Sequence, residues 1–502
     1  MVVLLSLTTT TVVCVLVVVL VVLGLAVEPC PPITAMQLCA MKALKTRAAR
    51  VGIMLRVFIS VHVLKSLTGA KIKRGEGRRG ERSRKIYFCM DMKRVVAVLV
   101  VGLLWLGRCP AQDPLPVALE SEDEPLVELG DSGASWVDRL CIRLDNILCG
   151  QIMERSQVAV VVYDLTADSL LYAINEEQSL RPASVEKVLT AVTALSVLGA
   201  GYELCTSLSY TGSVSEGVLW GDLWLRGEMD PMFDTADLRV FADSLRRLGI
   251  DSIAGQLIFD RSMKDTIPMG EGWSWDDFDS NPPLTPLLYC GRAGLEQAVS
   301  RALGEAGVAG PSIWMEGRVP AGATPICERR HTLSQLLIDM MKKSDNLHAE
   351  AMFYQLGRSS GQSTAERSAA RVEQFVLGLG FDRAMFNVAD GCGLSLYNYT
   401  TASIVVAVLR AAYHDPKICN TLRLSLPIAG LDGTLAKRLH NTSAFGNVRA
   451  KTGTVSRVST LAGYATSGEG HEVAFCIINQ GQRSASSARS LQDKVCIAIC
   501  DE

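Results

Sequence analysis

The chain has 502 residues, of which 48% are apolar and 20% are charged, so it is long enough for a large core and more than one domain. Its net charge of −2 hides an asymmetry: residues 1–94 carry 16 Lys and Arg against 4 Asp and Glu, a net of +12, and the rest carries 34 against 48, a net of −14. Because the positive charge is confined to an N-terminal extension, we exclude nucleic acid as a partner.

The extension, residues 1–111, has the composition of a leader. Residues 2–27 are uncharged and long enough to span a bilayer, and residues 71–85 are strongly basic. A second start-like pattern follows: Met92 opens a short basic segment, an apolar run follows, and Cys109-Pro110-Ala111 resembles a signal-peptidase site. Either residues 1–89 are a misassigned start before a signal peptide at about 92–111, or the whole leader is authentic and associates with the inner membrane. Both alternatives predict export.

Beyond an acidic linker at 112–135, the hydrophobic pattern predicts an α+β fold. In chain order we expect an amphipathic helix, an apolar β-hairpin, a helix with one face in the core, a second apolar helix, a three-strand antiparallel meander and a closing helix. Their ranges are Trp136–Leu148, Gln157–Tyr163 with Ser169–Ala173, 184–195, Leu333–Met341, then 447–454, 460–465 and 472–479, and 484–499. Early and late strands should meet in one central sheet that joins the two chain ends.

The middle of the chain looks like an insertion. Ser184 and Ser344 carry two of the motifs described below and are 160 positions apart, far more than a compact domain needs between them. Strand-like segments at 221–226 and 251–260 and a loop at 272–277 fall in this region. We therefore expect a smaller, strand-rich domain at 206–325, inserted into a catalytic domain made of 136–205 and 326–502.

The cysteines indicate neither a disulfide scaffold nor a metal site. Of 15 cysteines, 10 lie beyond the leader, and none forms a C-x-x-C pair. Cys141 and Cys149 are close enough in sequence to pair, and most of the others are expected to be buried thiols. The six histidines show no metal spacing. The spacing of these residues therefore predicts no metal site.

Three short motifs occur in a fixed order, and together they are far more specific than any one alone. Ser184-Val185-Glu186-Lys187 is an S-x-x-K sequence at a helix start, Ser344-Asp345-Asn346 follows an apolar helix, and Lys451-Thr452-Gly453 lies on a predicted strand. In this order they match the active-site elements of penicillin-interacting serine acyl-transferases. Separately, each reads as an ordinary helix surface, helix end or strand end.

The motifs predict nucleophilic catalysis by a serine. One helical turn places Lys187 beside Ser184, where a Lys187 of lowered pKa can act as the base; burial or the neighbouring Lys451 cation would lower it. Ser344 would relay the proton to the leaving nitrogen, and Asn346 would hold Lys187 and a substrate amide.

The strand motif would bind the substrate. Lys451 and Thr452 suit a carboxylate, and Gly453 would let a substrate backbone approach closely. The backbone N–H groups of Ser184 and Thr454 are candidates for the oxyanion hole.

From about Gln157 to Asn479 the sequence resembles the D-Ala-D-Ala carboxypeptidase/endopeptidase family of low-molecular-mass penicillin-binding proteins, in the DacB-like branch with an inserted domain. Beyond the three motifs, the similar segments are Arg181-Pro182-Ala183-Ser184, Gly221-Asp222-Leu223-Trp224-Leu225 with Asp230-Pro231, Gly272-Trp273, Glu350, Asp390-Gly391-Cys392-Gly393-Leu394-Ser395 and Leu426-Pro427-Ile428-Ala429-Gly430 with Gly433-Thr434-Leu435. Cys392 stands where Ser is usual and Leu396 where a basic residue is common, which affects loop packing or substrate contacts rather than the chemistry.

The resemblance implies a serine β-lactamase/transpeptidase-like fold, in which an antiparallel sheet is flanked by helices beside a helical subdomain. It also implies a periplasmic, cell-envelope enzyme that cleaves peptidoglycan stem peptides through an acyl-Ser184 intermediate and is inhibited by β-lactams. The resemblance implies no metal and no organic cofactor. A serine β-lactamase is an alternative, but no Glu-x-x-x-Asn loop lies between the motifs to deacylate the enzyme. A non-enzymatic β-lactam sensor or structural envelope protein is another, although all the catalytic side chains are present.

Overall fold

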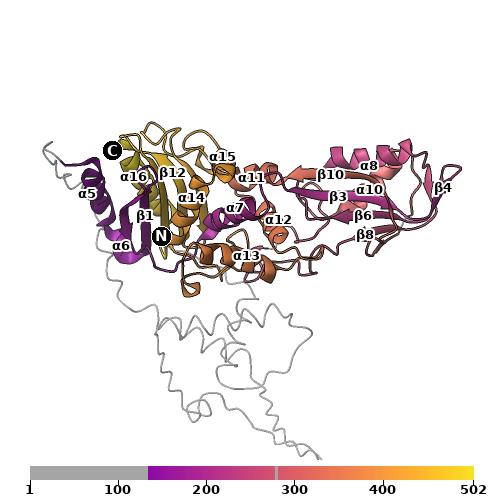
Figure 1. Ribbon diagram of the computed structural model, residues 1–502, viewed down its shortest axis with the longest axis horizontal. Helices are drawn as coiled ribbons and strands as arrows, with labels where there is room; N and C mark the ends of the chain where they lie inside the picture. Colours follow the sequence, from indigo (N-terminus) through magenta and orange to yellow (C-terminus); the bar gives the residue numbers. More distant parts are fainter. Residues whose placement is uncertain (1–133, 278–280, 312) are drawn as a thin grey trace, which may run out of the picture. The chain divides into compact units, whose positions relative to one another are not determined.

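The computed structural model describes residues 134–277, 281–311 and 313–502 (Figure 1). A central sheet of five antiparallel strands has the order β11-β12-β13-β1-β2. Its strands are β1 (Gln157–Asp164), β2 (Ser169–Ile174), β11 (Arg449–Val455), β12 (Val458–Thr466) and β13 (Glu472–Gln480). β1 pairs with β13 along its whole length, from Gln157 opposite Gln480 to Asp164 opposite Val473. The predicted hairpin, meander and joining of early and late strands in one sheet are confirmed.

Both faces of this sheet are buried, because alternate side chains of a strand point to opposite faces. Val158 and Val160 of β1 share one apolar cluster with helices α5 (Trp136–Leu148) and α16 (Ala485–Asp501). Ala159 and Val161 belong to a second cluster, with α7 (Glu186–Val197) and α14 (Ala402–His414). The two helix pairs cover opposite sides of the sheet in Figure 1, which confirms the α+β class.

Four further helices pack in the second cluster and form a helical subdomain. They are α11 (Leu333–Lys342), α12 (Asn346–Leu356), α13 (Ala365–Gly378) and α15 (Pro416–Ser425), with α6 (Gln151–Arg155) near β1 and short 3-10 turns η1 (Ala183–Val185), η2 (Arg383–Met385) and η3 (Gly433–Leu435). The sequence predicts that only one face of α7 is in the core, but every residue from Glu186 to Leu195 is buried. Helices pack around α7 on all sides, which its apolar periodicity does not indicate.

A second sheet is built from the middle of the chain. Its order is β10-β3-β6-β8-β9, with strands β3 (Glu203–Tyr210), β6 (Leu223–Gly227), β8 (Leu257–Asp260), β9 (Trp314–Glu316) and β10 (Thr324–Thr332). A small sheet of β4 (Ser213–Ser215), β5 (Val218–Trp220) and β7 (Ser252–Ile253) accompanies it. The chain enters along β3 and returns along β10, which pair antiparallel. We propose 206–325 as the extent of the inserted domain, although β3 begins slightly before it and β10 ends slightly after.

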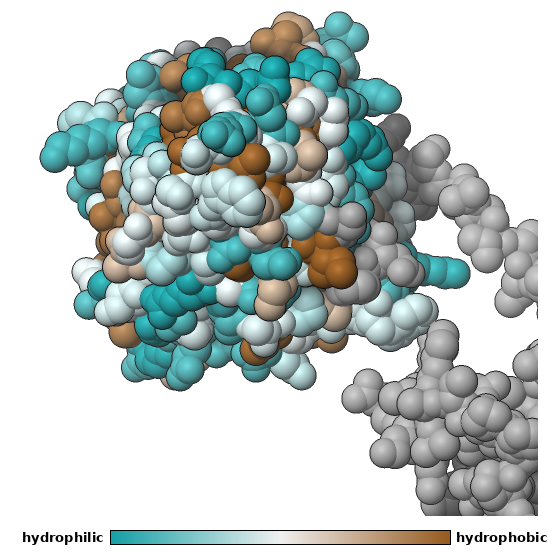
Figure 2. Space-filling view, turned by 90° about the vertical axis from the view of Figure 1, so that its right-hand side faces the viewer, coloured by the Kyte–Doolittle hydropathy of each residue, from teal (hydrophilic) through white to brown (hydrophobic). Residues whose placement is uncertain are grey.

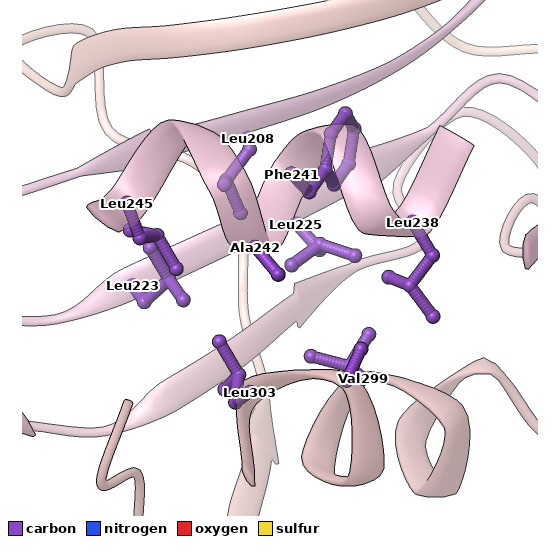
Figure 3. A pocket seen from close by; sticks show the side chains of 10 residues that line it. Leu208, Leu223, Leu225, Leu238, Phe241, Ala242, Leu245, Val299 and Leu303 are labelled. Atoms are coloured by element: carbon purple, nitrogen blue, oxygen red, sulfur yellow. The ribbon is translucent and has the colours of Figure 1, made fainter. Parts of the chain in front are cut away.

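Two helices close the second sheet over a core of its own. Leucines of β3 and β6 meet side chains of α8 (Thr235–Arg247) and α10 (Leu295–Glu305), which point toward the sheet in Figure 3. They surround a cavity of about 10 Å³. This volume is about that of a single water site, and the lining is apolar, so the cavity is a packing gap and not a binding site.

The surface of this middle region carries exposed apolar side chains, including Trp220 and Leu248. In Figure 2 the most hydrophobic residues on this side of the molecule, coloured brown, lie in several groups interrupted by hydrophilic residues rather than in one patch. Isolated exposed apolar residues of this kind are usual on protein surfaces.

The predicted leader lies outside the described residues, as do both alternatives for its start and all but the end of the acidic linker. None of the helices in the described part of the chain has the length and apolar character required to cross a membrane. The ten cysteines from Cys141 to Cys500 are all free, so Cys141 and Cys149 do not pair. Five of the ten are buried.

Candidate active site

Ser184 lies in η1, immediately before α7, and its side chain is partly accessible. The Lys187 Nζ lies 3.0 Å from the Ser184 Oγ, as the helical spacing of the first motif predicts. Ala183 precedes the serine with φ of 47°, in the left-handed region that non-glycine residues rarely occupy. Such a conformation costs about 1–3 kcal/mol and persists only where the surrounding structure imposes it. The backbone at the serine is therefore held by its neighbours.

Lys187 is fully buried and has three hydrogen-bond acceptors around its Nζ. These are the Ser184 Oγ at 3.0 Å, the Asn346 Oδ1 at 2.8 Å and the Cys392 carbonyl oxygen at 2.7 Å. Burial lowers the pKa of Lys187, and nearby acidic groups oppose this effect in part. Three motif residues, Ser184, Lys187 and Asn346, are thus joined in one hydrogen-bonded group.

Ser344 and Lys451 form a second group. The Lys451 Nζ donates to the Ser344 Oγ at 2.8 Å and to the Thr452 carbonyl oxygen at 2.6 Å. Ser344 has φ of 61°, and the next residue caps α12. Burial holds the pKa of Lys451 well below its usual range, and the Lys187 charge lowers it further. The sequence analysis offers burial or the Lys451 cation as the cause of a lowered Lys187 pKa. In the structure, burial is the largest cause of the lowered pKa of both lysines.

Gly453 lies against Ser184, the predicted nucleophile. A Cβ at this position would be 2.8 Å from the Ser184 backbone nitrogen and 2.1 Å from the Thr460 Oγ1. The same Thr460 Oγ1 donates to the Pro182 carbonyl oxygen at 2.8 Å. The sequence predicts a glycine here because a substrate backbone has to approach closely. The structure gives a second reason for glycine, since β11 packs against the backbone of Ser184 itself. Gly453 is therefore required for the fold of the site itself.

Thr452 and Thr454, on either side of Gly453, lie along β11, which is an edge strand of the central sheet. The Thr452 Oγ1 donates to the Thr434 Oγ1 at 2.7 Å, and Thr434 belongs to η3. Thr454 is exposed. The open edge of β11 therefore presents Thr452 and Thr454 beside Ser184, where an extended peptide can be bound.

A tight loop after α13 supplies the Cys392 carbonyl oxygen. Asp390 anchors this loop, since its carboxylate accepts from the backbone nitrogens of Gly393 and Ser395 at 2.7 and 2.6 Å and from the Asn398 Nδ2 at 2.6 Å. Gly393 has φ of +85°, and a Cβ there would lie 1.8 Å from the Ala183 carbonyl oxygen. The side chain of Cys392 is buried, and burial raises the pKa of its thiol. Cys392 thus contributes its backbone to the site, while its thiol packs within the loop.

Two buried glutamates lie near Lys187 without taking part in the predicted chemistry. Glu350 accepts from the Gly391 backbone nitrogen at 2.9 Å, and burial with the Asp390 charge raises its pKa to about 8. Glu186 is fully buried, and neither carboxyl oxygen has a hydrogen-bond partner. Burial, together with the Asp390 and Glu350 charges, raises the pKa of Glu186 well above its usual range.

The described residues contain one set of three side chains that could hold a metal ion. Glu350, Asp390 and Cys392 have ligand atoms within 4.8 Å of one another, and all three are buried. The carboxylate of Asp390 is already occupied by three donors of its own loop and by the Trp273 Nε1 at 2.8 Å. These hydrogen bonds account for the cluster as a structural anchor of the loop.

The sequence predicts none of the contacts that reach the site from the middle of the chain. Besides the Trp273 contact to Asp390, the Asn281 Oδ1 accepts from the Asn346 Nδ2 at 2.8 Å. Gly272-Trp273 is one of the segments that resemble the family, so Trp273 could have been identified from the sequence. No sequence feature signals Asn281.

Known proteins match the chain over most of the described residues. The model of the D-Ala-D-Ala carboxypeptidase 3 (S13) family matches residues 140–288 and 291–498. A D-alanyl-D-alanine carboxypeptidase of Actinomadura sp. (strain R39) is 28% identical over 468 residues, covering 74% of this chain and 86% of that protein. The D-alanyl-D-alanine carboxypeptidase DacB of Haemophilus influenzae is 25% identical over 425 residues, covering 65% of this chain and 86% of that protein.

Solved structures show the same fold. Penicillin binding protein 4 (dacB) from Haemophilus influenzae matches with a TM-score of 0.63 and 22% identity, covering 70% of this chain and 97% of that chain. A second structure of that protein, complexed with a β-lactam, matches with a TM-score of 0.56 and 22% identity.

Proposed function

We propose, from the premise that the chain belongs to the D-Ala-D-Ala carboxypeptidase 3 (S13) family, that it is a serine-type peptidase of the bacterial cell wall. It releases the terminal D-Ala of peptidoglycan stem peptides, cleaves D,D cross-bridges, or does both, through an acyl-Ser184 intermediate. The observation that carries this proposal is the 3.0 Å contact between the Lys187 Nζ and the Ser184 Oγ in a site that depresses the pKa of the lysine. A serine hydroxyl needs such a base to become a nucleophile.

In the first half of the reaction, the Lys187 Nζ takes the proton of the Ser184 hydroxyl, and the Oγ attacks the carbonyl carbon of the scissile bond. The backbone N–H groups of Ser184 and Thr454 stabilise the oxyanion. The proximity of β11 to the Ser184 backbone, measured at Gly453, supports this pairing.

The carbon–nitrogen bond then breaks, and the leaving nitrogen takes a proton delivered through Ser344, which Lys451 holds at 2.8 Å. Asn346 keeps Lys187 in place, and Lys451 with Thr452 binds the terminal carboxylate of the peptide. Water hydrolyses the Ser184 ester and restores the free enzyme.

β-Lactams are the expected inhibitors, because their strained amide acylates the same serine and leaves an ester that is slowly hydrolysed. A serine β-lactamase is a second candidate, because it would form the same acyl-Ser184 intermediate from a β-lactam. A non-enzymatic sensor would share the β-lactam adduct. No cofactor enters either half of the proposed reaction.

We place the enzyme in the periplasm, in contact with the cell wall that contains its substrate. Residues 92–111 would direct export as a signal peptide. If the whole leader is authentic, its apolar run at 2–27 would associate the enzyme with the inner membrane.

The test is mass spectrometry with peptide mapping after the full-length protein has reacted with benzylpenicillin, with Ser184→Ala as the matched control. We expect a long-lived adduct on Ser184 and none in the variant. The same protein should release D-Ala from a pentapeptide ending in D-Ala-D-Ala or cleave a cross-linked muropeptide. Absence of an adduct contradicts the proposal, rapid turnover of the drug supports a β-lactamase, and an adduct without peptide cleavage supports a sensor.

A further inference from the structure

Asn281, from the middle of the chain, contacts the side-chain amide of Asn346 directly. The Asn346 Nδ2 donates to the Asn281 Oδ1 at 2.8 Å, and the Asn346 Oδ1 accepts from the Lys187 Nζ at 2.8 Å. We propose that Asn281 is a positioning residue that fixes the amide orientation of Asn346 and, through it, the hydrogen bonding of Lys187. This inference rests on the proposed function for its meaning, although its geometry can be tested without it.

The orientation of the Asn346 amide decides which of its atoms faces Lys187. Asparagine has one acceptor oxygen and one donor nitrogen, which are similar in shape but opposite in hydrogen bonding. A reversed Asn346 would turn its NH₂ group toward the Lys187 Nζ, which is a donor when protonated. It would also turn its oxygen toward the Asn281 oxygen. Both contacts would become repulsive, so the orientation of Asn346 depends on what Asn281 offers.

Asn281 offers an oxygen because its nitrogen is already engaged. The Asn281 Nδ2 donates to the Asp277 carbonyl oxygen at 2.8 Å, and the Asn281 backbone nitrogen donates to the same oxygen at 3.0 Å. A carbonyl oxygen accepts only, so the amide of Asn281 has one favourable orientation. The order of donors and acceptors then runs without conflict from Asp277 through Asn281 and Asn346 to Lys187.

Further hydrogen bonds hold the residues around Asn281 in place, and one of them reaches the loop that carries Cys392. The Trp273 Nε1 donates to the Asp390 Oδ2 at 2.8 Å, and the Ser274 backbone nitrogen donates to the Asp277 Oδ2 at 2.8 Å. A Cβ on Gly272 would lie 2.6 Å from the Ser395 Oγ. Beyond Asn281, the Leu284 backbone nitrogen donates to the Pro268 carbonyl oxygen at 2.9 Å.

The charged groups around Lys187 explain why one neutral amide matters. The Cys392 thiol and the carboxyl groups of Asp390, Glu350 and Asp345 act on the pKa of Lys187. The Lys187 charge in turn lowers the pKa of both Glu186 and Lys451. Asn346 is a neutral acceptor among them, so it holds Lys187 in place without adding charge. A negative charge at position 281 would act on Lys187 through Asn346 and favour its protonated form.

The test compares Asn281→Ala and Asn281→Asp with the wild-type full-length protein, using the pH dependence of benzylpenicillin acylation. We expect Asn281→Ala to acylate about five- to tenfold more slowly at its pH optimum, as for the loss of one hydrogen bond. Asn281→Asp keeps an acceptor oxygen for the Asn346 Nδ2 but loses the donor to the Asp277 carbonyl oxygen. We expect its negative charge to move the acidic limb of the profile upward by about half a pH unit or more. Asn420→Ala and Asn420→Asp are matched controls on the exposed face of α15 and should leave rate and profile unchanged.

Wild-type rates and profiles in both Asn281 variants would overturn the inference while leaving the proposed function intact. A lower rate with an unshifted profile in Asn281→Asp would also overturn it, since a merely structural role gives that result. A wild-type protein that is not acylated at all would refute the proposed function. In that case a crystal structure of Asn281→Asp or Asn281→Ala decides the inference: an Asn346 Oδ1 that turns away from Lys187 in the alanine variant supports it, and one that stays in place overturns it.

Discussion

Replacing Glu350 by glutamine should remove a large part of the pH dependence of this protein's stability. Glu350 is buried in α12, and its Oε1 accepts from the Gly391 backbone nitrogen at 2.9 Å. Glutamine keeps that acceptor and has the shape of the neutral acid. Glu350→Gln is therefore a permanent copy of the protonated side chain.

The magnitude follows from the shift in pKa. Burial and the Asp390 charge raise the pKa of Glu350 from 4.5 to about 8. The folded state therefore retains a proton that the unfolded chain loses between pH 4.5 and 8, and the free energy of unfolding falls as pH rises through this window. At 1.36 kcal/mol per pH unit, the loss is about 3 kcal/mol at pH 7 and about 5 kcal/mol above pH 8. Below pH 4.5 both states are protonated and the loss is absent.

The assay is urea unfolding followed by tryptophan fluorescence at pH values from 4.5 to 8.5. We expect wild type and Glu350→Gln to have similar stability near pH 4.5 and to diverge steadily, with the variant more stable at pH 8. Glu305→Gln, on an exposed position at the end of α10, is the matched control and should follow the wild type. Curves for wild type and Glu350→Gln that stay parallel across the whole range would refute the reasoning, because they would show that Glu350 ionises in the folded protein as it does in the unfolded chain.

Two further variants test the site itself. Lys187→Ala should abolish benzylpenicillin acylation. Its unfolding free energy should stay unchanged or rise, because a fully buried ammonium is costly to desolvate. Labelling of the variant at the wild-type rate would exclude Lys187 as the base. Gly453→Ala should lower both stability, by about 1–3 kcal/mol, and acylation, because its Cβ would lie 2.8 Å from the Ser184 nitrogen; a thermal melt and an acylation rate like those of the wild type would show that β11 has room to move.

Much of the fold was predictable because its signals are local. The helix at Trp136–Leu148 and the strand pairs of the hairpin and meander lie where the apolar periodicity predicts them. Ser184 and Lys187 meet within one helical turn, so their spacing alone implies contact. The order of the three motifs indicates the family, and the match to the S13 family model confirms that prediction.

Contacts between distant segments were decided only by the tertiary structure. Burial of α7 on every face, which lowers the pKa of Lys187, depends on helices that follow it by more than a hundred residues. The fit of Gly453 against the Ser184 backbone and the approach of Asn281 to Asn346 likewise join segments far apart in the chain. Periodicity and motif spacing report on neighbours along a helix or strand, whereas desolvation and amide orientation depend on whichever atoms the packed fold brings within a few ångströms.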